Sequence, residues 1–171
     1  LFYSTNSLAQ ESLEEVVITS SRIPTPLRQI GTSMSVITLE DIERRQSNFL
    51  TDILKSQTSI TISNSGGPGK ATAVRIRGEE GYRTLVRLDG INISDTSGPQ
   101  ISPRMGQLLS AGVTRVEILR GPQGLLYGAD AGGVINISTS KDTGELAGSV
   151  SMESGSHSTN QKTASISGGN G

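Results

Sequence analysis

A cluster of glycines between two apolar stretches is the feature that most limits how this chain can fold. Val113–Leu119 alternates apolar and polar residues and Val134–Ile137 is again apolar, so both stretches are predicted to be strands. Five glycines lie within thirteen residues between them, namely Gly121, Gly124, Gly128, Gly132 and Gly133. Because glycine weakens the interior of helices and strands, this density predicts tight turns or a backbone pressed against another surface.

Composition narrows the class of protein. The 171 residues suffice for one domain with a core, and the net charge of -1 provides no basic field that would attract nucleic acid. The absence of cysteine excludes disulfides, thiolate catalysis and cysteine metal sites. Aromatic residues make up only 3% of the chain, which also carries 21 glycines, so we expect a loop-rich fold. No run of about eighteen apolar residues occurs, so no transmembrane helix is expected.

Residues with catalytic potential are scattered. His157 is the only histidine and lies in a turn-like polar segment, where a bystander role is the ordinary expectation. No Cys/His cluster, no nucleophile-elbow motif and no calcium-loop spacing is present. We therefore expect neither an enzyme nor a bound metal or cofactor.

The first half of the chain predicts two short helices. Thr38 lies three residues before Asp41, which indicates a capping box and a helix through Arg45. Ser47 or Asn48 is predicted to cap a second helix, whose apolar stripe comprises Leu50, Ile53 and Leu54. The other predicted elements are strands at Ser33–Ile37, Ile60–Ile62, Ala73–Gly78, Thr84–Leu88 and Ile91–Ile93, and a brief helix containing Met105, Leu108 and Leu109.

Turn and loop signals separate these elements. Asp89-Gly90 is a strong hairpin signal between two predicted strands. Ser63–Thr72 and Asp95–Arg104 are polar, glycine-containing loops. The first of them is not a phosphate-binding P-loop, because Asn64 stands where that motif needs glycine and Ala71 where it needs Ser or Thr.

After Thr139 the pattern changes to two alternating segments. Leu146–Glu153 and Gln161–Ser167 flank the turn-like Ser154–Asn160, which predicts a β-hairpin. The lengths approach the 9–11 residues of a transmembrane strand. The outward positions form a thin apolar face made of Leu146, Val150, Met152, Ala164 and Ile166. We interpret this hairpin as the beginning of a membrane barrel.

Several motifs together resemble one family. Glu117-x-x-Arg120-Gly121-Pro122 is followed by Leu126-Tyr127-Gly128 and by Gly132-Gly133-Val134-Ile135-Asn136-Ile137, and is preceded by Ile76-Arg77-Gly78 and by Val86-Arg87-Leu88-Asp89-Gly90. In this order and spacing, from about Glu14 to Thr139, they resemble the plug domain of TonB-dependent outer-membrane receptors. The resemblance implies an α+β fold, with a small mixed β-sheet, short helices and long loops, followed by the first strands of a transmembrane β-barrel.

The N-terminal segment gains a role from this resemblance. Leu13–Thr19 is β-prone, and Pro24-x-Pro26 behind it predicts that it remains an extended, unpaired strand. Such a strand is a template for strand addition by a partner, although an ordinary edge strand is the simpler interpretation. The segment is similar to a TonB box, which implies that TonB binds the following residues: Glu15, Val16, Val17, Ile18, Thr19 and Ser20.

The resemblance also implies two further kinds of site. The ligand is expected at two outer loops, on Ser65, Gly66, Gly67, Pro68, Gly69 and Lys70 and on Asp95, Thr96, Ser97 and Gly98. Arg77, Arg120 and Glu117 are expected to hold the domain against the inner wall of the barrel. The alternative is local pairing, in which the arginines at 75, 77 and 120 bind Glu117, Asp89 or Glu79.

The resulting hypothesis has four segments and one rival. We expect a signal-peptide remnant at 1–9, the TonB-box segment at 10–26, the plug at 27–142 and the start of the barrel at 143–171, all belonging to a longer chain in the outer membrane. The implied function is uptake of an iron-siderophore, haem, cobalamin or similar nutrient, opened by TonB with the inner-membrane proton gradient. The rival is a soluble periplasmic interaction module that binds a partner by strand addition.

Overall fold

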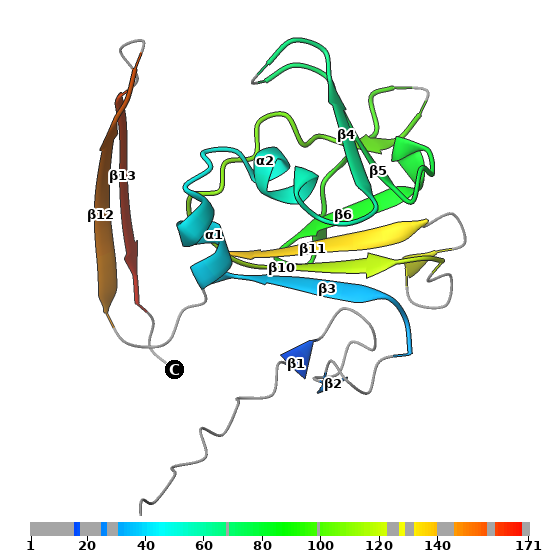
Figure 1. Cartoon of the computed structure of the whole chain (residues 1–171), viewed down its shortest axis with the longest axis horizontal. Coiled ribbons are helices and arrows are strands. Elements are labelled where there is room, and N and C mark those ends of the chain that lie inside the picture. The colour runs from blue at the N-terminus through cyan, green and yellow to red at the C-terminus, as the bar shows by residue number, and fades with distance from the viewer. Residues whose placement is uncertain are drawn as a thin grey trace, which may run out of the picture.

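The fold is organised around a mixed five-stranded sheet. The computed structural model describes residues 16–17, 25–26, 31–67, 69–98, 100–122, 127–128, 132–139, 146–156 and 160–168. The sheet has the strand order β3-β10-β11-β6-β7. Its strands are β3 (Met34–Thr38), β10 (Val113–Arg120), β11 (Gly133–Thr139), β6 (Thr84–Leu88) and β7 (Ile91–Asn92). Figure 1 shows the first four running side by side through the middle of the domain.

The two strands that flank the glycine cluster lie next to each other inside this sheet. β10 pairs antiparallel with both β11 and β3, while β11 pairs in parallel with β6. The turn between β6 and β7 contains Asp89 and Gly90 with φ of 47° and 85°, and places Leu88 opposite Ile91. The predicted Asp-Gly hairpin is therefore confirmed, and the mixed sheet with short helices agrees with the expected fold class.

One face of the sheet carries the main core. Register and alternation place Val116 and Ile118 of β10 on this face beside Ile135, Ile137 and Val86, all of them fully buried. The helices α1 (Leu39–Arg45) and α2 (Leu50–Lys55) contribute Ile42, Leu50, Ile53 and Leu54 to the same cluster. Neither helix is long and apolar enough to cross a membrane, which holds for every helix in the described residues.

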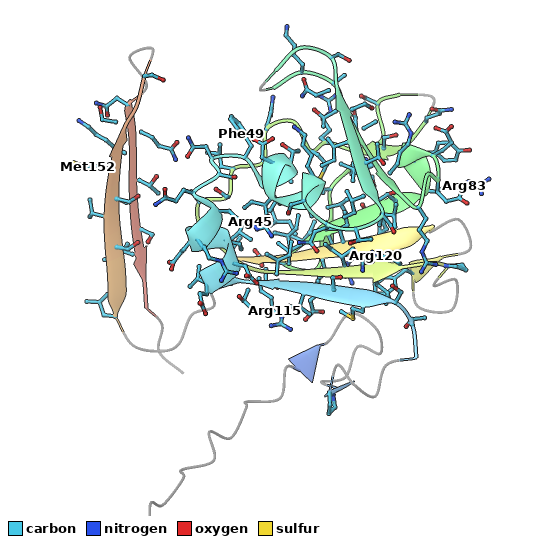
Figure 2. The ribbon with its side chains drawn as sticks, in the orientation of Figure 1. Arg45, Phe49, Arg83, Arg115, Arg120 and Met152 are labelled. Carbon is cyan, nitrogen blue, oxygen red and sulfur yellow. The ribbon has the colours of Figure 1, made fainter. Side chains whose placement is uncertain are left out.

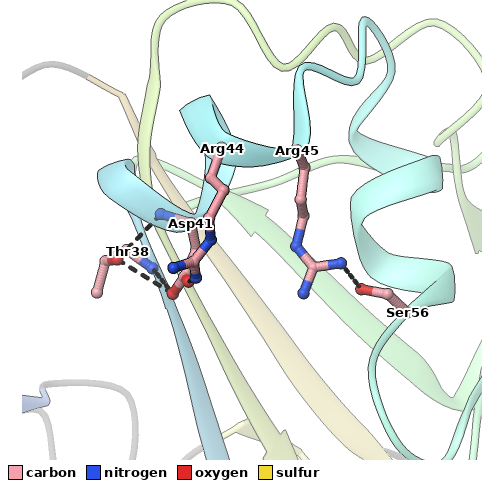
Figure 3. A network of polar contacts seen from close by, with 5 residues as sticks. All are labelled: Thr38, Asp41, Arg44, Arg45 and Ser56. Atoms are coloured by element: carbon pink, nitrogen blue, oxygen red, sulfur yellow. Dashed lines mark hydrogen bonds and ion pairs between the residues drawn. The ribbon is translucent and has the colours of Figure 1, made fainter.

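Helix α1 begins with the predicted capping box. The Thr38 hydroxyl accepts a hydrogen bond from the Asp41 amide at 3.3 Å, and the Asp41 carboxylate accepts one from the Thr38 amide at 3.3 Å. Arg44 forms an ion pair with the same carboxylate, and Arg45 reaches across to donate to the Ser56 hydroxyl at 2.5 Å (Figure 3). The helix is thus fixed at its start by its own residues and at its end by the residue that follows α2.

Helix α2 differs from the prediction at its start. Its N-cap is Phe49, which makes no side-chain capping bond, so the prediction that Ser47 or Asn48 caps the helix is wrong. The amide of Leu50 instead donates to the carbonyl of Leu108 at 3.0 Å. The first turn of α2 therefore has a hydrogen-bond acceptor from a distant part of the backbone, where the sequence predicts a capping side chain.

Two short hairpins extend from the sheet region. β4 (Ile60–Asn64) pairs antiparallel with β5 (Thr72–Ile76), and β8 (Ser94–Asp95) pairs with β9 (Ser102–Pro103). A 3-10 helix, η2 (Gly81–Arg83), follows β5. The predicted brief helix at Met105–Leu109 is wrong, because Leu109 forms a β-bridge with Phe49 and Gly106-Gln107 is a turn.

The N-terminal strand is paired, contrary to expectation. β1 (Val16–Val17) forms a two-residue antiparallel ladder with β2 (Thr25–Pro26). Proline lacks an amide hydrogen but keeps its carbonyl, so it can end a short ladder even though it cannot continue one. The prediction of an unpaired strand at this position is therefore wrong.

The C-terminal hairpin has the predicted form. β12 (Ala147–Ser154) pairs antiparallel with β13 (Asn160–Ser167) over their full length, with Val150 opposite Ala164. In Figure 1 this hairpin lies to one side of the five-stranded sheet.

Candidate functional site

The first predicted ligand loop contacts Gly106, which lies two residues after the end of the second. The amide of Gly69 donates to the Gly106 carbonyl at 2.9 Å, and Gly106 packs so closely on the Lys70 carbonyl that a side chain there would overlap it. The turn at 64–71 is held by Asn64, whose side-chain oxygen accepts from the amides of Gly66 and Gly67 at 2.9 and 2.5 Å. The turn after β4 and the segment that follows β9 therefore form one unit.

A cavity of about 310 Å³ lies between these segments. Its walls are polar and aliphatic, and they comprise Gly69, Lys70, Ala71, Thr72, Asp95, Gln100, Ser102, Pro103, Arg104, Met105, Gly106 and Gln107. A second cavity of about 290 Å³ is lined by residues that include Phe49 and Asp52 of the α2 region. Thr72 and Gly106 line both cavities, so the Gly106 contact borders each of them.

Asp95 is the most strongly held carboxylate in this region. It accepts from the Ser97 hydroxyl at 2.7 Å, from the Ser97 amide at 3.0 Å and from Arg104 Nε at 2.7 Å. The two bonds from Ser97, followed by the bond from Arg104, lower the pKa of Asp95 to about 2. Asp95 therefore stays ionised and fixes the shape of the loop, while Lys70 is exposed at the cavity wall.

The predicted loop residues are only partly brought together. Lys70, Gly69 and Asp95 line the larger cavity, whereas the remaining described loop residues do not. Those outside the lining are Ser65, Gly66, Gly67, Thr96, Ser97 and Gly98. Pro68 lies outside the described residues.

The motif arginines converge at one end of β10. Arg120 is only 6% exposed and lies on the core face of the sheet (Figure 2). Its Nε donates to the Thr58 carbonyl at 3.1 Å and its Nη1 to the Ser35 hydroxyl at 2.7 Å. Arg77 lies in the turn after β5 with φ 55° and is exposed, so the prediction that it continues a strand to Gly78 is wrong.

Burial and a neighbouring charge both act on the Arg120 guanidinium. Burial lowers the pKa of Arg120, and the positive charge of Arg77 lowers it further. Gly121 follows Arg120 in the chain, and a Cβ built on Gly121 would lie 3.6 Å from Arg77 Nη1. The Arg77 side chain therefore reaches the end of β10. Within the described part of the chain, no carboxylate forms an ion pair with either group.

The carboxylates proposed for local pairing have other partners. Glu117 is buried and binds Arg115 Nε at 2.9 Å. Glu79 lies 3.4 Å from Arg83, and Asp89 accepts from the amide and hydroxyl of Thr139 at 2.8 and 2.7 Å. Arg75 bonds the Ser63 hydroxyl at 3.0 Å and lies 3.9 Å from Glu80. In the described residues, none of the arginines at 75, 77 and 120 forms an ion pair with Glu117, Asp89 or Glu79, so the predicted partners are wrong. Within that part of the chain, local pairing itself occurs only at Arg75, whose partner is Glu80.

The C-terminal hairpin has two unlike faces. Val150, Met152 and Ile166 lie on one face and are 73%, 75% and 79% exposed; Figure 2 marks Met152 on this hairpin. The opposite face carries hydroxyl groups, and Ser149 and Ser165 lie 2.7 Å apart there. The apolar face also carries Lys162, opposite Met152. Three large apolar side chains this exposed on one face nevertheless indicate contact with another apolar phase or surface.

The structure describes only part of the predicted TonB-binding segment. Of the predicted TonB-binding segment, the backbone of Val16 and Val17 is described, whereas Glu15, Ile18, Thr19 and Ser20 lie outside the described residues, as does His157. In the described part of the chain no cluster of three or more His, Cys, Asp or Glu side chains could hold a metal ion.

Sequence reasoning missed Gly106, Ser35 and Thr58. Thr58 contributes a backbone carbonyl, which leaves no trace in residue type, and Ser35 is one of many serines in alternating segments. Gly106 could have been noticed, because it follows the apolar Met105 and belongs to no turn motif that can be recognised in the sequence. A glycine in such a place indicates a close backbone contact.

Comparisons with known proteins agree with this geometry. The sequence profile described as TonB-dependent Receptor Plug Domain matches residues 26–135. The vitamin B12 transporter BtuB of Vibrio vulnificus is 36% identical over 155 residues, covering 90% of this chain and 25% of the transporter. Its name is that of a transporter, and the similar structures include the ferripyoverdine and alcaligin outer-membrane receptors, none of them named as an enzyme.

Two solved structures share the fold. FpvA of Pseudomonas aeruginosa, bound to heterologous pyoverdines, has a TM-score of 0.70 at 25% identity, with 90% of this chain and 20% of that chain covered. The alcaligin outer-membrane receptor FauA of Bordetella pertussis has a TM-score of 0.72 at 22% identity, with 89% and 26% covered. The chain thus spans about a quarter or less of the length of these relatives.

Proposed function

The chain belongs to the TonB-dependent receptor plug domain family, and from that premise we propose that it closes an outer-membrane active transporter for a scarce nutrient. The nutrient is a metal chelate such as an iron-siderophore, haem or cobalamin. In this proposal residues 10–26 form the TonB-box segment after a signal remnant at 1–9, residues 27–142 form the plug, and residues 143–171 begin the barrel. The N-terminus then lies in the periplasm and the plug lies inside the barrel.

The two-faced β12–β13 hairpin is the observation that favours a transporter over a soluble module. Val150, Met152 and Ile166 expose most of their surface on one face, while serines line the other. Alternation of this kind matches a strand with lipid on one side and a polar lumen on the other. A soluble module would have to leave this apolar face in water.

The interlocked loops are the proposed place of ligand contact. The cavity of about 310 Å³ is of the size that small-molecule sites occupy, and hydrogen-bonding groups from both loops reach it. Lys70 and Gln100 bring donors, and Asp95 with Arg104 forms a fixed polar edge. The described residues of the wall are aliphatic and polar, so the proposed recognition here uses hydrogen bonds and charge.

The arginine pair is the proposed contact with the barrel wall. Two like charges at one end of β10, without a carboxylate partner in the described residues, favour an acidic surface opposite them. Arg77 is exposed and free to make this contact directly, whereas Arg120 has already committed two donors inside the domain. Glu117 lies on the opposite face of β10 and binds Arg115, nearer the start of the strand, so in this proposal it is a separate contact point from the arginine pair.

TonB is the proposed partner at the N-terminal segment. Strand addition uses backbone groups, and Val16–Val17 already has strand geometry. Because these residues pair with Thr25–Pro26 along one edge, TonB in this proposal either replaces β2 as their neighbour or adds to the opposite edge of β1. A two-residue ladder is short enough for such an exchange.

Uptake of radiolabelled cyanocobalamin and of a ferric siderophore tests the proposal. The protein that contains this chain is expressed in cells that lack their own receptors, with and without TonB and with a proton uncoupler. We expect uptake of at least one probe that disappears without TonB or with the uncoupler. If the protein is instead recovered from the soluble periplasmic fraction and transports neither probe, the rival interaction module is the correct interpretation.

A further inference from the structure

Arg120 joins two parts of the domain that have different proposed tasks. Its Nη1 bonds Ser35, which lies in β3, the first strand of the sheet after the N-terminal segment. Its Nε bonds the carbonyl of Thr58, two residues before β4 begins. β4 leads directly into the turn that carries Lys70 and the wall of the larger cavity.

Two backbone hydrogen bonds reinforce the same junction. The amide of Arg120 donates to the Ser33 carbonyl at 2.9 Å, which ties the end of β10 to the beginning of β3. The amide of Arg77 donates to the Ser59 carbonyl at 2.8 Å, which closes the base of the β4–β5 hairpin beside Thr58. The first strand, the hairpin base and the end of β10 therefore meet at one guanidinium group.

The position of β3 makes this junction vulnerable to a pull from the N-terminus. β3 lies at the edge of the sheet, with β10 as its one neighbour in the described sheet. An edge strand can leave by breaking the bonds to a single neighbour, whereas β10 and β11 are paired on both sides. Arg120 is 6% exposed, so losing an acceptor would leave donors of a buried cation unsatisfied.

We propose that Arg120 is a positioning residue that couples β3 to the hairpin carrying the ligand loop. When β3 is displaced, the guanidinium loses Ser35, its hold on the Thr58 carbonyl weakens, and the base of the β4–β5 hairpin loosens. This inference rests on the proposed function. It gives a route by which TonB, pulling on the N-terminal segment, weakens the binding of a ligand at the outer loop.

Hydrogen exchange of individual amides tests the coupling in the receptor purified with its barrel. Ser35→Ala removes the hydroxyl acceptor and nothing else from the cluster. We expect the Arg77 amide, which closes the hairpin base, to exchange about tenfold faster in this variant. The Asp89 amide, bonded to the Ile137 carbonyl at 2.9 Å at the opposite end of the sheet, is expected to keep its rate.

Matched variants separate coupling from general weakening. Ser33→Ala changes an exposed serine of the same segment, whose carbonyl and not its side chain contacts Arg120, and is expected to leave the Arg77 rate unchanged. Ser35→Thr keeps a hydroxyl and is expected to restore the wild-type rate. Arg120→Lys cannot reach both acceptors, so it repeats the test if Ser35→Ala folds poorly.

Two results would overturn the inference. One is an unchanged Arg77 rate in Ser35→Ala, and the other is an equal rise at Arg77 and Asp89, which would mean a uniform loss of stability. Neither result depends on transport, so a failure of the uptake experiment and a failure of this coupling can be told apart.

Discussion

The amide nitrogen of Gly69 and the carbonyl oxygen of Gly106 lie 2.9 Å apart. Their hydrogen bond joins the turn after β4 to the segment after β9, and both of these loops line the larger cavity. The contact depends on the missing side chain at 106, because a Cβ there would overlap the Lys70 carbonyl and lie 2.9 Å from the Thr72 hydroxyl. Both obstacles belong to the same short segment. One residue type at one position therefore determines how the two loops fit together.

Gly106→Ala is expected to lower the free energy of unfolding by about 1–3 kcal/mol, the usual cost of forcing a methyl group into a packed site. It should also displace the turn at Lys70 and weaken binding of any ligand that contacts both loops. Denaturant unfolding measures the first effect and equilibrium binding the second. Gly31→Ala is the control, since no atom lies within 4 Å of a Cβ at that position. Equal stability of the two variants would contradict the interlocked arrangement.

Gly133→Ala tests the packing at the start of β11. A Cβ at this position would lie 2.6 Å from Ile76 Cδ1 and 2.9 Å from the Leu119 carbonyl oxygen, so we expect a loss of about 1–3 kcal/mol in unfolding free energy. Ile76→Val removes the nearer atom and by itself should cost about 0.5–1.5 kcal/mol. In the double variant the two losses should sum to less than their separate values. Strict additivity in denaturant titrations would refute the contact.

Asp95 gives the domain a defined response to acid. Its pKa in the folded state is lowered from 3.8 to about 2, chiefly by Ser97 and then by Arg104. A lowered folded pKa means that the carboxylate contributes stability above pH 3.8, and that this contribution disappears as the pH falls toward 2. An NMR titration of the carboxyl carbon should find the low midpoint, and Ser97→Ala and Arg104→Gln should each raise it. A wild-type midpoint near 3.8 would exclude the network.

Local elements could be predicted from the sequence where a local rule decides them. Thr38 and Asp41 are three residues apart and cap α1 as expected, and Asp89-Gly90 turns between β6 and β7. The alternation around Val150 likewise specifies a hairpin whose register needs no other part of the chain. In each case the interacting residues are close in sequence, so residue type and spacing contain the information.

Pairing over long distances could not be predicted in this way. Nothing in the alternation of β3 indicates that it lies against β10 with Ile37 opposite Val116, or that β6 is parallel to β11. The same limit applies to the site: Arg120 is recognisable as a motif residue, yet its acceptors are a serine 85 positions away and a backbone carbonyl 62 positions away. Backbone acceptors and tertiary register leave no pattern in a single sequence.

The two faces of the C-terminal hairpin lead to a prediction about membrane insertion. Val150→Lys places a charge on the apolar face, where a lysine at the bilayer midplane costs about 2–4 kcal/mol. Ser151→Lys places the same charge one residue later, on the hydroxyl-lined face, and should cost much less. Folding of the complete receptor into lipid vesicles, followed by its change in electrophoretic mobility, measures both. If the two variants fold equally well, β12 is not a lipid-facing strand.

The N-terminal strand gives the most direct test of TonB capture. Strand addition uses backbone hydrogen bonds, so Val17→Pro, which removes an amide hydrogen, should reduce uptake far more than Val17→Ala, which removes only side-chain atoms. Thr25→Pro disturbs the partner strand β2 and leaves the Val17 amide in place, so it should preserve uptake. A loss of uptake in Val17→Pro could come from failed TonB binding or from a broken β1–β2 ladder, and Thr25→Pro distinguishes the two explanations. If Thr25→Pro also abolishes uptake, the β1–β2 ladder itself is required. If all three variants transport equally, TonB does not bind here by adding a strand.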